Sequence, residues 1–115
     1  MSQDQKSKIK QLAQQIKDNP GDSFSKFALA LEFRKQGDFK KSRILFEDIL
    51  SNDPDYVGVY YHLGKLYEAL DRLGDARDLY RKGIEVANQQ DESRTEKELN
   101  EALQHVEMEI DERTN

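Results

Sequence analysis

Cysteine and tryptophan are absent from the 115 residues, and proline (two) and glycine (six) are scarce. Without cysteine the chain has no disulfide framework, no thiolate ligand for zinc and no thiol nucleophile. No apolar run approaches the roughly 18 residues that a membrane-spanning helix needs, and residues 1–17 lack the apolar centre of a secretory signal. We therefore expect a cytoplasmic protein that does not contact membranes. The few β-branched residues and the scarcity of helix breakers favour helices over strands.

Hydrophobic residues make up 36% of the chain and charged residues another 36%. So low a hydrophobic content is also found in disordered chains. Here, however, the apolar residues recur at regular spacing, which indicates folded amphipathic helices.

Charge is unevenly distributed along the chain. Residues 1–50 hold 10 Lys/Arg and 7 Asp/Glu, whereas residues 51–115 hold 8 and 16, and the net charge is -5. Nucleic-acid binding requires a positive footprint, so we expect no nucleic-acid partner. The lysines of the first half are interpreted as solvated helix surface.

The apolar spacing predicts about six helices separated by turn signals such as Asn19-Pro20-Gly21-Asp22 and Asn52-Asp53-Pro54-Asp55. The first is expected over residues 3–18, with Ile9, Leu12, Ala13 and Ile16 on its apolar face. The last is expected over residues 93–112. Its start, Ser93-Arg94-Thr95-Glu96, reads as a capping box, in which Ser93 would precede the helix and Glu96 would reach back to it.

A period of 34 residues relates the middle of the chain to itself, because Pro20 and Pro54 are 34 residues apart. When residues 23–56 are laid on residues 57–90 without a gap, small residues meet small ones and aromatic residues meet aromatic ones. Ala30 falls on Gly64, and Phe46 falls on Tyr80. A period of this length, with two helices in each unit, is typical of helical-repeat proteins.

With these residues the chain resembles the tetratricopeptide repeat family, whose pattern is W-x2-L-G-x2-Y, then A-x3-F, then P. The second unit contains Tyr60-x2-Leu63-Gly64-x2-Tyr67 and then Ala76-x3-Tyr80, with Asn88 in place of the final proline. The first contains Lys26-x2-Leu29-Ala30-x2-Phe33, Ser42-x3-Phe46 and Pro54. Lys26 departs from the pattern at the Trp position, where Phe24 or Phe27 is expected to substitute. The turn Gly37-Asp38-Phe39 matches the family, whereas Asp71-Arg72-Leu73 does not.

The resemblance implies an all-α, right-handed solenoid of antiparallel helix pairs that forms one domain over residues 1–115. Its parts would be an N-terminal helix (3–18), a first repeat (23–56), a second repeat (57–90) and a capping helix (93–112). In such a stack the first helix of each pair lines the concave side, which commonly binds protein segments. The positions that correspond to this groove are Phe27, Leu31, Arg34, Lys35, Tyr61, His62, Lys65 and Glu68, with Phe24 and Ala28 at its apolar end.

A groove that is apolar at one end and carries Arg34, Lys35 and Lys65 suits an acidic peptide with a hydrophobic anchor. The alternative is that Phe24, Phe27 and Leu31 pack against the N-terminal helix. Some family members clamp the terminal carboxylate of chaperones with Lys and Asn. Those positions hold Phe27, Leu31 and His62 here, so the clamp is not expected.

The leading hypothesis is a non-catalytic protein-interaction module. His62 and His105 have no further ligand at a metal-binding spacing, and the chain has no phosphate-binding, dinucleotide-binding or G-x-S-x-G motif, so no enzyme, metal or cofactor is expected. Two alternatives stay open: a self-associating structural protein that pairs through Ile9, Leu12 and Ile16, and a regulatory subunit of an enzyme complex. The expected state is a monomer or a weak homodimer.

Overall fold

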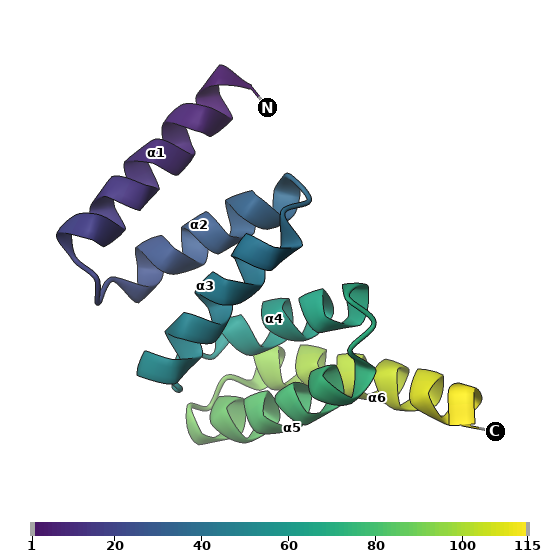
Figure 1. Cartoon of the computed structure of the whole chain (residues 1–115). Helices are drawn as coiled ribbons and strands as arrows, with labels where there is room; N and C mark the ends of the chain where they lie inside the picture. Colours follow the sequence, from purple (N-terminus) through teal and green to yellow (C-terminus); the bar gives the residue numbers. More distant parts are fainter. Residues whose placement is uncertain (1, 115) are drawn as a thin grey trace. The chain divides into compact units, whose positions relative to one another are not determined.

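The structure, a computed structural model, describes residues 2–114, which form six helices and no strand (Figure 1). The helices are α1 (Gln3–Asp18), α2 (Ser23–Lys35), α3 (Phe39–Asn52), α4 (Gly58–Ala69), α5 (Leu73–Gln89) and α6 (Ser93–Thr114). The all-α class and the arrangement in helix pairs expected from the sequence are confirmed.

The chain divides into two compact units, residues 1–54 with α1–α3 and residues 55–115 with α4–α6. The division falls directly after Pro54, two residues before the expected end of the first repeat (23–56). The assignment of all 115 residues to a single domain stays a prediction.

The same turn joins successive helices at three places: between α2 and α3, between α4 and α5, and between α5 and α6. Gly37, Asp71 and Asp91 all have a positive φ (79°, 60° and 57°). In each case the amide of the following residue donates to a carbonyl five residues back, as Asp38 N does to Phe33 O (2.9 Å) and Arg72 N to Tyr67 O (2.8 Å). Asp is one of the residues that tolerates the left-handed conformation. The departure at Asp71-Arg72-Leu73 therefore leaves the shape of the turn unchanged.

Helix ends follow the local sequence, with one correction. α3 ends at Asn52, before the Asp53-Pro54 pair, because a proline disfavours helical backbone in the residue before it. α5 has no such proline and continues to Gln89. Ser93 is the first residue inside α6, not the residue before it, so the predicted capping box is wrong. Glu96 N instead donates to the carbonyl of Glu92 (2.9 Å).

Two glycines set the spacing of the helices in the second unit. A Cβ on Gly64 of α4 would lie 2.1 Å from the ring of Tyr80 in α5. A Cβ on Gly83 of α5 would lie 2.6 Å from Tyr60 Cβ and 3.1 Å from Leu99 of α6. The small residue that the repeat pattern places at Gly64 thus lets α4 and α5 approach closely.

In the first unit a hydroxyl group joins the two helices of the pair. Ser42 Oγ of α3 donates to the carbonyl of Ala30 in α2 (2.8 Å), and both residues are fully buried. Lys26, at the Trp position of the pattern, is itself buried, and its Nζ lies 2.6 Å from Asp48 Oδ2. Phe24 is 72% exposed, so it does not substitute at that position.

The interface of α1 with α2 combines apolar and polar contacts. Leu12 is the one buried residue of α1, Ile9 and Ile16 are half-buried, and Ala13 is exposed, contrary to its expected place on the apolar face. Lys8 Nζ lies 2.9 Å from Glu32 Oε1, and Ser25 Oγ lies 3.0 Å from Gln15 Oε1. The ion pair with Lys8 lowers the pKa of Glu32 below 4.5, against the opposing effect of burial.

Because the carboxyl pKa of Glu32 is lower in the folded chain, its contribution to stability is complete above the unfolded pKa near 4.5 and is lost as the pH falls through the lower, folded value. We expect Glu32→Gln to reduce the free energy of unfolding by about 1–3 kcal/mol at pH 7. The difference between the two proteins should shrink as the pH is lowered from 6 to 3. Urea unfolding at several pH values measures it.

The matched control is Glu85→Gln, which removes one carboxylate whose side chain is 67% exposed. We expect it to change the free energy of unfolding by less than about 0.5 kcal/mol at pH 7. A loss in Glu32→Gln that is the same at every pH would contradict the assignment of the effect to the ionised carboxyl group.

Candidate binding surfaces

The apolar residues of α2 expected in the groove lie on the face opposite its buried side. The buried positions of α2 are Ser25, Lys26, Leu29, Ala30 and Glu32. A second set of residues is spaced by four, three and four positions and therefore forms one line along the helix. These residues are Phe24, Ala28, Leu31 and Lys35. Phe24 is 72% exposed, Ala28 and Leu31 are half-buried, and Lys35 is exposed. We call these four residues the α2 stripe.

Phe27 and Arg34 flank the α2 stripe and are held by α3. The ring of Phe27 meets that of Phe46 edge-on, with 5.8 Å between their centroids. The guanidinium of Arg34 lies 5.6 Å from the ring centroid of Phe39. The alternative that Phe24 packs against the N-terminal helix is wrong, since Phe24 is exposed and the buried contacts of α1 are made by other residues.

A hollow lies at the carboxyl end of the α2 stripe, lined by Gln5, Lys35, Gln36 and Asp38. Lys35 Nζ is 3.6 Å from Glu32 Oε1, an oxygen that it shares with Lys8. Gln36 Nε2 is buried without a hydrogen-bond partner among the described residues, and so is Arg34 Nη1. This end of α2 therefore holds more donors than it uses internally.

In the second unit the predicted groove residues form one cluster on α4, and all four are half-buried. The rings of Tyr61 and His62 meet edge-on at 5.8 Å. Lys65 Nζ lies 5.6 Å from the ring centroid of Tyr61 and 3.7 Å from Glu68 Oε2. Glu68 also accepts a short hydrogen bond from the hydroxyl of Tyr80.

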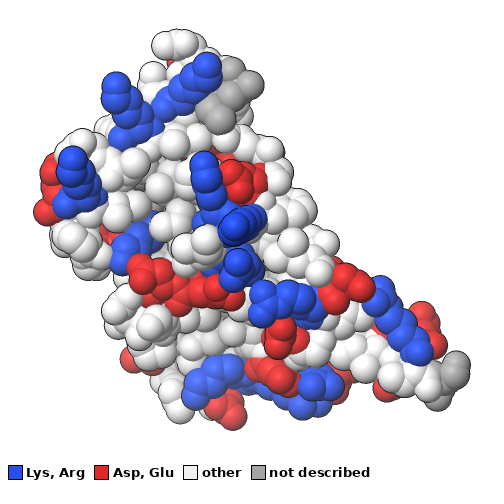
Figure 2. Space-filling model, viewed as in Figure 1, with Lys and Arg blue, Asp and Glu red and all other residues white. Residues whose placement is uncertain are grey.

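The 34-residue period shows how the two surfaces differ in chemistry. Leu31 of α2 corresponds to Lys65 of α4, and Arg34 corresponds to Glu68. On both helices a lysine lies near a carboxylate, Lys35 near Glu32 (3.6 Å) and Lys65 near Glu68 (3.7 Å). The α2 surface differs by its apolar residues and by a second cation, since Arg34 and Lys35 both lie in the first unit. On the face drawn in Figure 2, Lys and Arg side chains are prominent over that unit, and both signs mix over the second.

Sequence reasoning missed Gln36 and the sharing of Glu32 between Lys8 and Lys35. Neither has a motif of its own. One signal was available in the sequence of α2. If its apolar stripe faces solvent, helical spacing places polar residues on the buried side of the helix.

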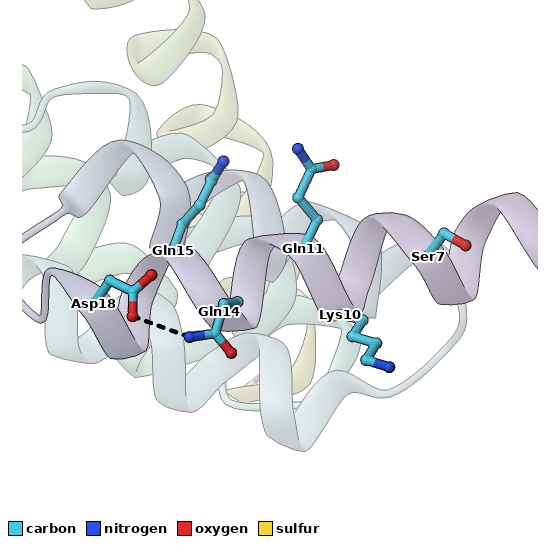
Figure 3. Close-up of a pocket in the computed structure, with 6 residues that line it drawn as sticks. All are labelled: Ser7, Lys10, Gln11, Gln14, Gln15 and Asp18. Atoms are coloured by element: carbon cyan, nitrogen blue, oxygen red, sulfur yellow. Dashed lines mark hydrogen bonds between the residues drawn. The ribbon is translucent and has the colours of Figure 1, made fainter.

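A second hollow follows the exposed face of α1 (Figure 3), lined by Ser7, Lys10, Gln11, Gln14, Gln15 and Asp18. All six residues are polar, and Gln14 Nε2 donates to Asp18 Oδ1 (2.9 Å), as the dashed line shows. It is a solvated surface with no apolar side chain to receive a partner. Within residues 2–114 no cluster of three or more His, Asp or Glu side chains is arranged to hold a metal ion. No helix of the described chain is long and apolar enough to cross a membrane.

Comparison with known proteins places these helix pairs in a family. The sequence model of the tetratricopeptide repeat matches residues 33–95. A TPR repeat-containing protein of Methanocaldococcus jannaschii is 40% identical over 68 residues, which are 59% of this chain and 21% of that protein. The chain thus spans about one fifth of the length of this relative.

Solved structures agree with the sequence match. The crystal structure of a tetratricopeptide repeat domain protein from Salinibacter ruber is 48% identical, with a TM-score of 0.73, and the match covers 75% of this chain and 97% of that one. The TPR2B domain of yeast Sti1, in a pHsp70 complex, is 15% identical with a TM-score of 0.84, and the match covers 92% and 85% of the two chains. The second likeness concerns the fold alone. The match of the family model over residues 33–95 and the likeness to the Salinibacter ruber domain show that the chain belongs to the tetratricopeptide repeat family.

Proposed function

We propose that the protein is a non-catalytic interaction module that binds a segment of another protein through the outward faces of α2 and α4, which the repeat pattern assigns to the concave side. The single observation that carries the proposal is the α2 stripe. A phenylalanine that is 72% exposed, followed along one helix line by Ala28 and Leu31, is apolar surface that the first unit leaves uncovered.

Support comes also from a structural relative, since the TPR2B domain of yeast Sti1 was solved in a pHsp70 complex. For the present chain we propose a protein or peptide partner with an acidic group and a hydrophobic anchor. The chaperone clamp is not part of the proposal, because its positions hold Phe27, Leu31 and His62.

Self-association through α1 finds less support. Leu12, which was central to the expected pairing surface, is only 9% exposed, and Ile9 and Ile16 are half-buried. The remaining exposed face of α1 is polar. We therefore propose that the protein acts as a monomer.

Combined replacement of Arg34, Tyr61 and Lys65 by alanine should abolish capture of a bound partner while the helical signal in circular dichroism stays unchanged. None of the three side chains is fully buried, so their removal is expected to alter the binding surface and leave the core intact. The measurement is affinity capture from a lysate of the source cells, followed by quantification of each captured protein.

The matched control is Arg94→Ala/Lys97→Ala/His105→Ala, which removes a comparable set of side chains from the exposed face of α6. It should retain capture at the level of the unchanged protein. Retention of every partner by the Arg34/Tyr61/Lys65 variant would show that the binding surface lies elsewhere.

A further inference from the structure

We infer that the α2 stripe binds an extended peptide segment that presents an apolar side chain at one position and a carboxylate about five positions away. This inference rests on the proposed function and names its ligand. The apolar side chain contacts Phe24, and the carboxylate reaches Lys35 at the opposite end of α2.

The apolar end is defined by Phe24, in the first turn of α2. Its side chain is the most exposed of the large hydrophobic residues that the structure describes. Asp22 lies beside it as the N-cap and accepts from Ser25 N (3.0 Å). The hydrogen bonds from Ser25 lower the pKa of Asp22 below 3.8, so this carboxylate is charged at neutral pH. A negative charge in the ligand is therefore disfavoured at the Phe24 end.

At the other end, Lys35 borders the hollow that is also lined by Gln5, Gln36 and Asp38. The side chain of Lys35 is 66% exposed. Asp38 is engaged at the start of α3, where its carboxylate accepts from Lys41 N (3.2 Å) and lies 3.7 Å from Lys41 Nζ. An exposed ammonium at the edge of this hollow suits a carboxylate, which accepts a charge-assisted hydrogen bond from it.

The spacing follows from helix geometry. Phe24 and Lys35 are 11 residues apart in α2, so at a rise of 1.5 Å per residue they are separated by about 16 Å along the helix axis. An extended peptide advances about 3.3 Å per residue and covers that distance in about five residues. Ala28 and Leu31 lie between the two ends and offer a continuous apolar surface to the intervening backbone.

The α4 cluster does not offer the same arrangement. Gly58 stands at the position of Phe24, and Ala69 stands at the position of Lys35. The preference for one anchor and one carboxylate at a fixed distance is therefore assigned to the first unit alone.

Synthetic peptides test the inference with the full-length chain. Each carries a fluorophore, a Ser/Gly background, one Phe and one Asp, and a C-terminal amide, with Phe and Asp two, five or eight positions apart. A fourth peptide replaces the Asp side chain by a free C-terminal carboxylate five positions from Phe. Fluorescence anisotropy is expected to show that the five-position peptide binds about tenfold more tightly than the other two spacings, a difference of about 1.4 kcal/mol. Comparison with the fourth peptide shows whether a side-chain or a terminal carboxylate is preferred.

Two variants locate the contacts. Phe24→Ser should reduce the affinity of the five-position peptide to that of a peptide without Phe, and Lys35→Glu to that of a peptide without Asp. Lys35→Arg should retain binding. Met108→Ser and Lys97→Glu, on the exposed face of α6, are the matched controls and should change nothing.

Equal affinity for all three spacings, or binding that is insensitive to both Phe24→Ser and Lys35→Glu, would overturn the inference. If partner capture nevertheless depends on Arg34, Tyr61 and Lys65, the proposed function stands and only the ligand assignment fails. If every one of these variants retains both peptide binding and partner capture, the ligand assignment and the proposed function are both overturned.

Discussion

Deletion of residues 91–115 is expected to unfold the second unit. α6 supplies Leu99, Ala102 and Val106 to its core, and Leu99 and Val106 are fully buried. Loss of these side chains, with exposure of the α5 surface that they cover, removes about 5 kcal/mol or more of hydrophobic stabilisation. That amount is comparable to the whole stability of a small domain, about 5–15 kcal/mol. Thermal unfolding followed by circular dichroism should show the loss of one cooperative transition.

A shorter deletion, residues 108–115, serves as the control for this experiment. It keeps all three buried residues and removes the exposed Met108 together with the ion pairs of Arg113 to Asp71 (2.7 Å) and to Glu109 (3.0 Å). Exposed ion pairs contribute little, so we expect a much smaller loss of stability than after the longer deletion. An unchanged melting temperature after the longer deletion would refute the role of α6 as a cap.

Gly64→Ala is expected to lower the free energy of unfolding by about 2 kcal/mol and the melting temperature by about 8 °C. The added Cβ would lie 2.1 Å from the ring of Tyr80, and that ring is fully buried and cannot move aside. The ordinary gain from replacing a helical glycine by alanine, about 0.5–1 kcal/mol, is smaller than this steric cost. Chemical denaturation and differential scanning calorimetry measure both quantities.

Gly74→Ala is the matched control, because its added Cβ would meet only Arg77 Nη2, at 3.9 Å. It should leave stability unchanged or slightly increased. In a Tyr80→Leu background, Gly64→Ala should cost at least about 1 kcal/mol less than in the unchanged chain, since the clashing ring is gone. Strictly additive effects of the two changes would contradict a direct contact.

The repeat period predicted the elements that depend on small and aromatic residues at fixed spacing. The close approach of α4 and α5 at Gly64, and that of α2 and α3 at Ala30 and Ser42, follow from it. The turn at Gly37 also follows, whereas the same left-handed turn at Asp71 does not, because Asp71-Arg72-Leu73 departs from the family's turn sequence.

Pattern reasoning was less informative where polar residues are buried. Lys26 and Glu32 look like surface residues in the sequence, yet each finds an oppositely charged partner on a neighbouring helix, Asp48 and Lys8. Those partners are 22 and 24 residues away in the chain, and no local motif links them. The orientation of the α2 stripe, and with it the candidate site, could therefore be proposed from the sequence but not fixed by it.

In the complex that we propose, the sharing of Glu32 between Lys8 and Lys35 would link partner binding to the docking of α1. A ligand carboxylate that draws Lys35 away from Glu32 would leave that oxygen to Lys8 alone, so the bound state would hold α1 more firmly than the free state. Linkage is reciprocal, so a change that strengthens the docking of α1 would raise the affinity for the ligand by the same factor. The N-terminal helix would then modulate the strength with which the α2 stripe holds its partner.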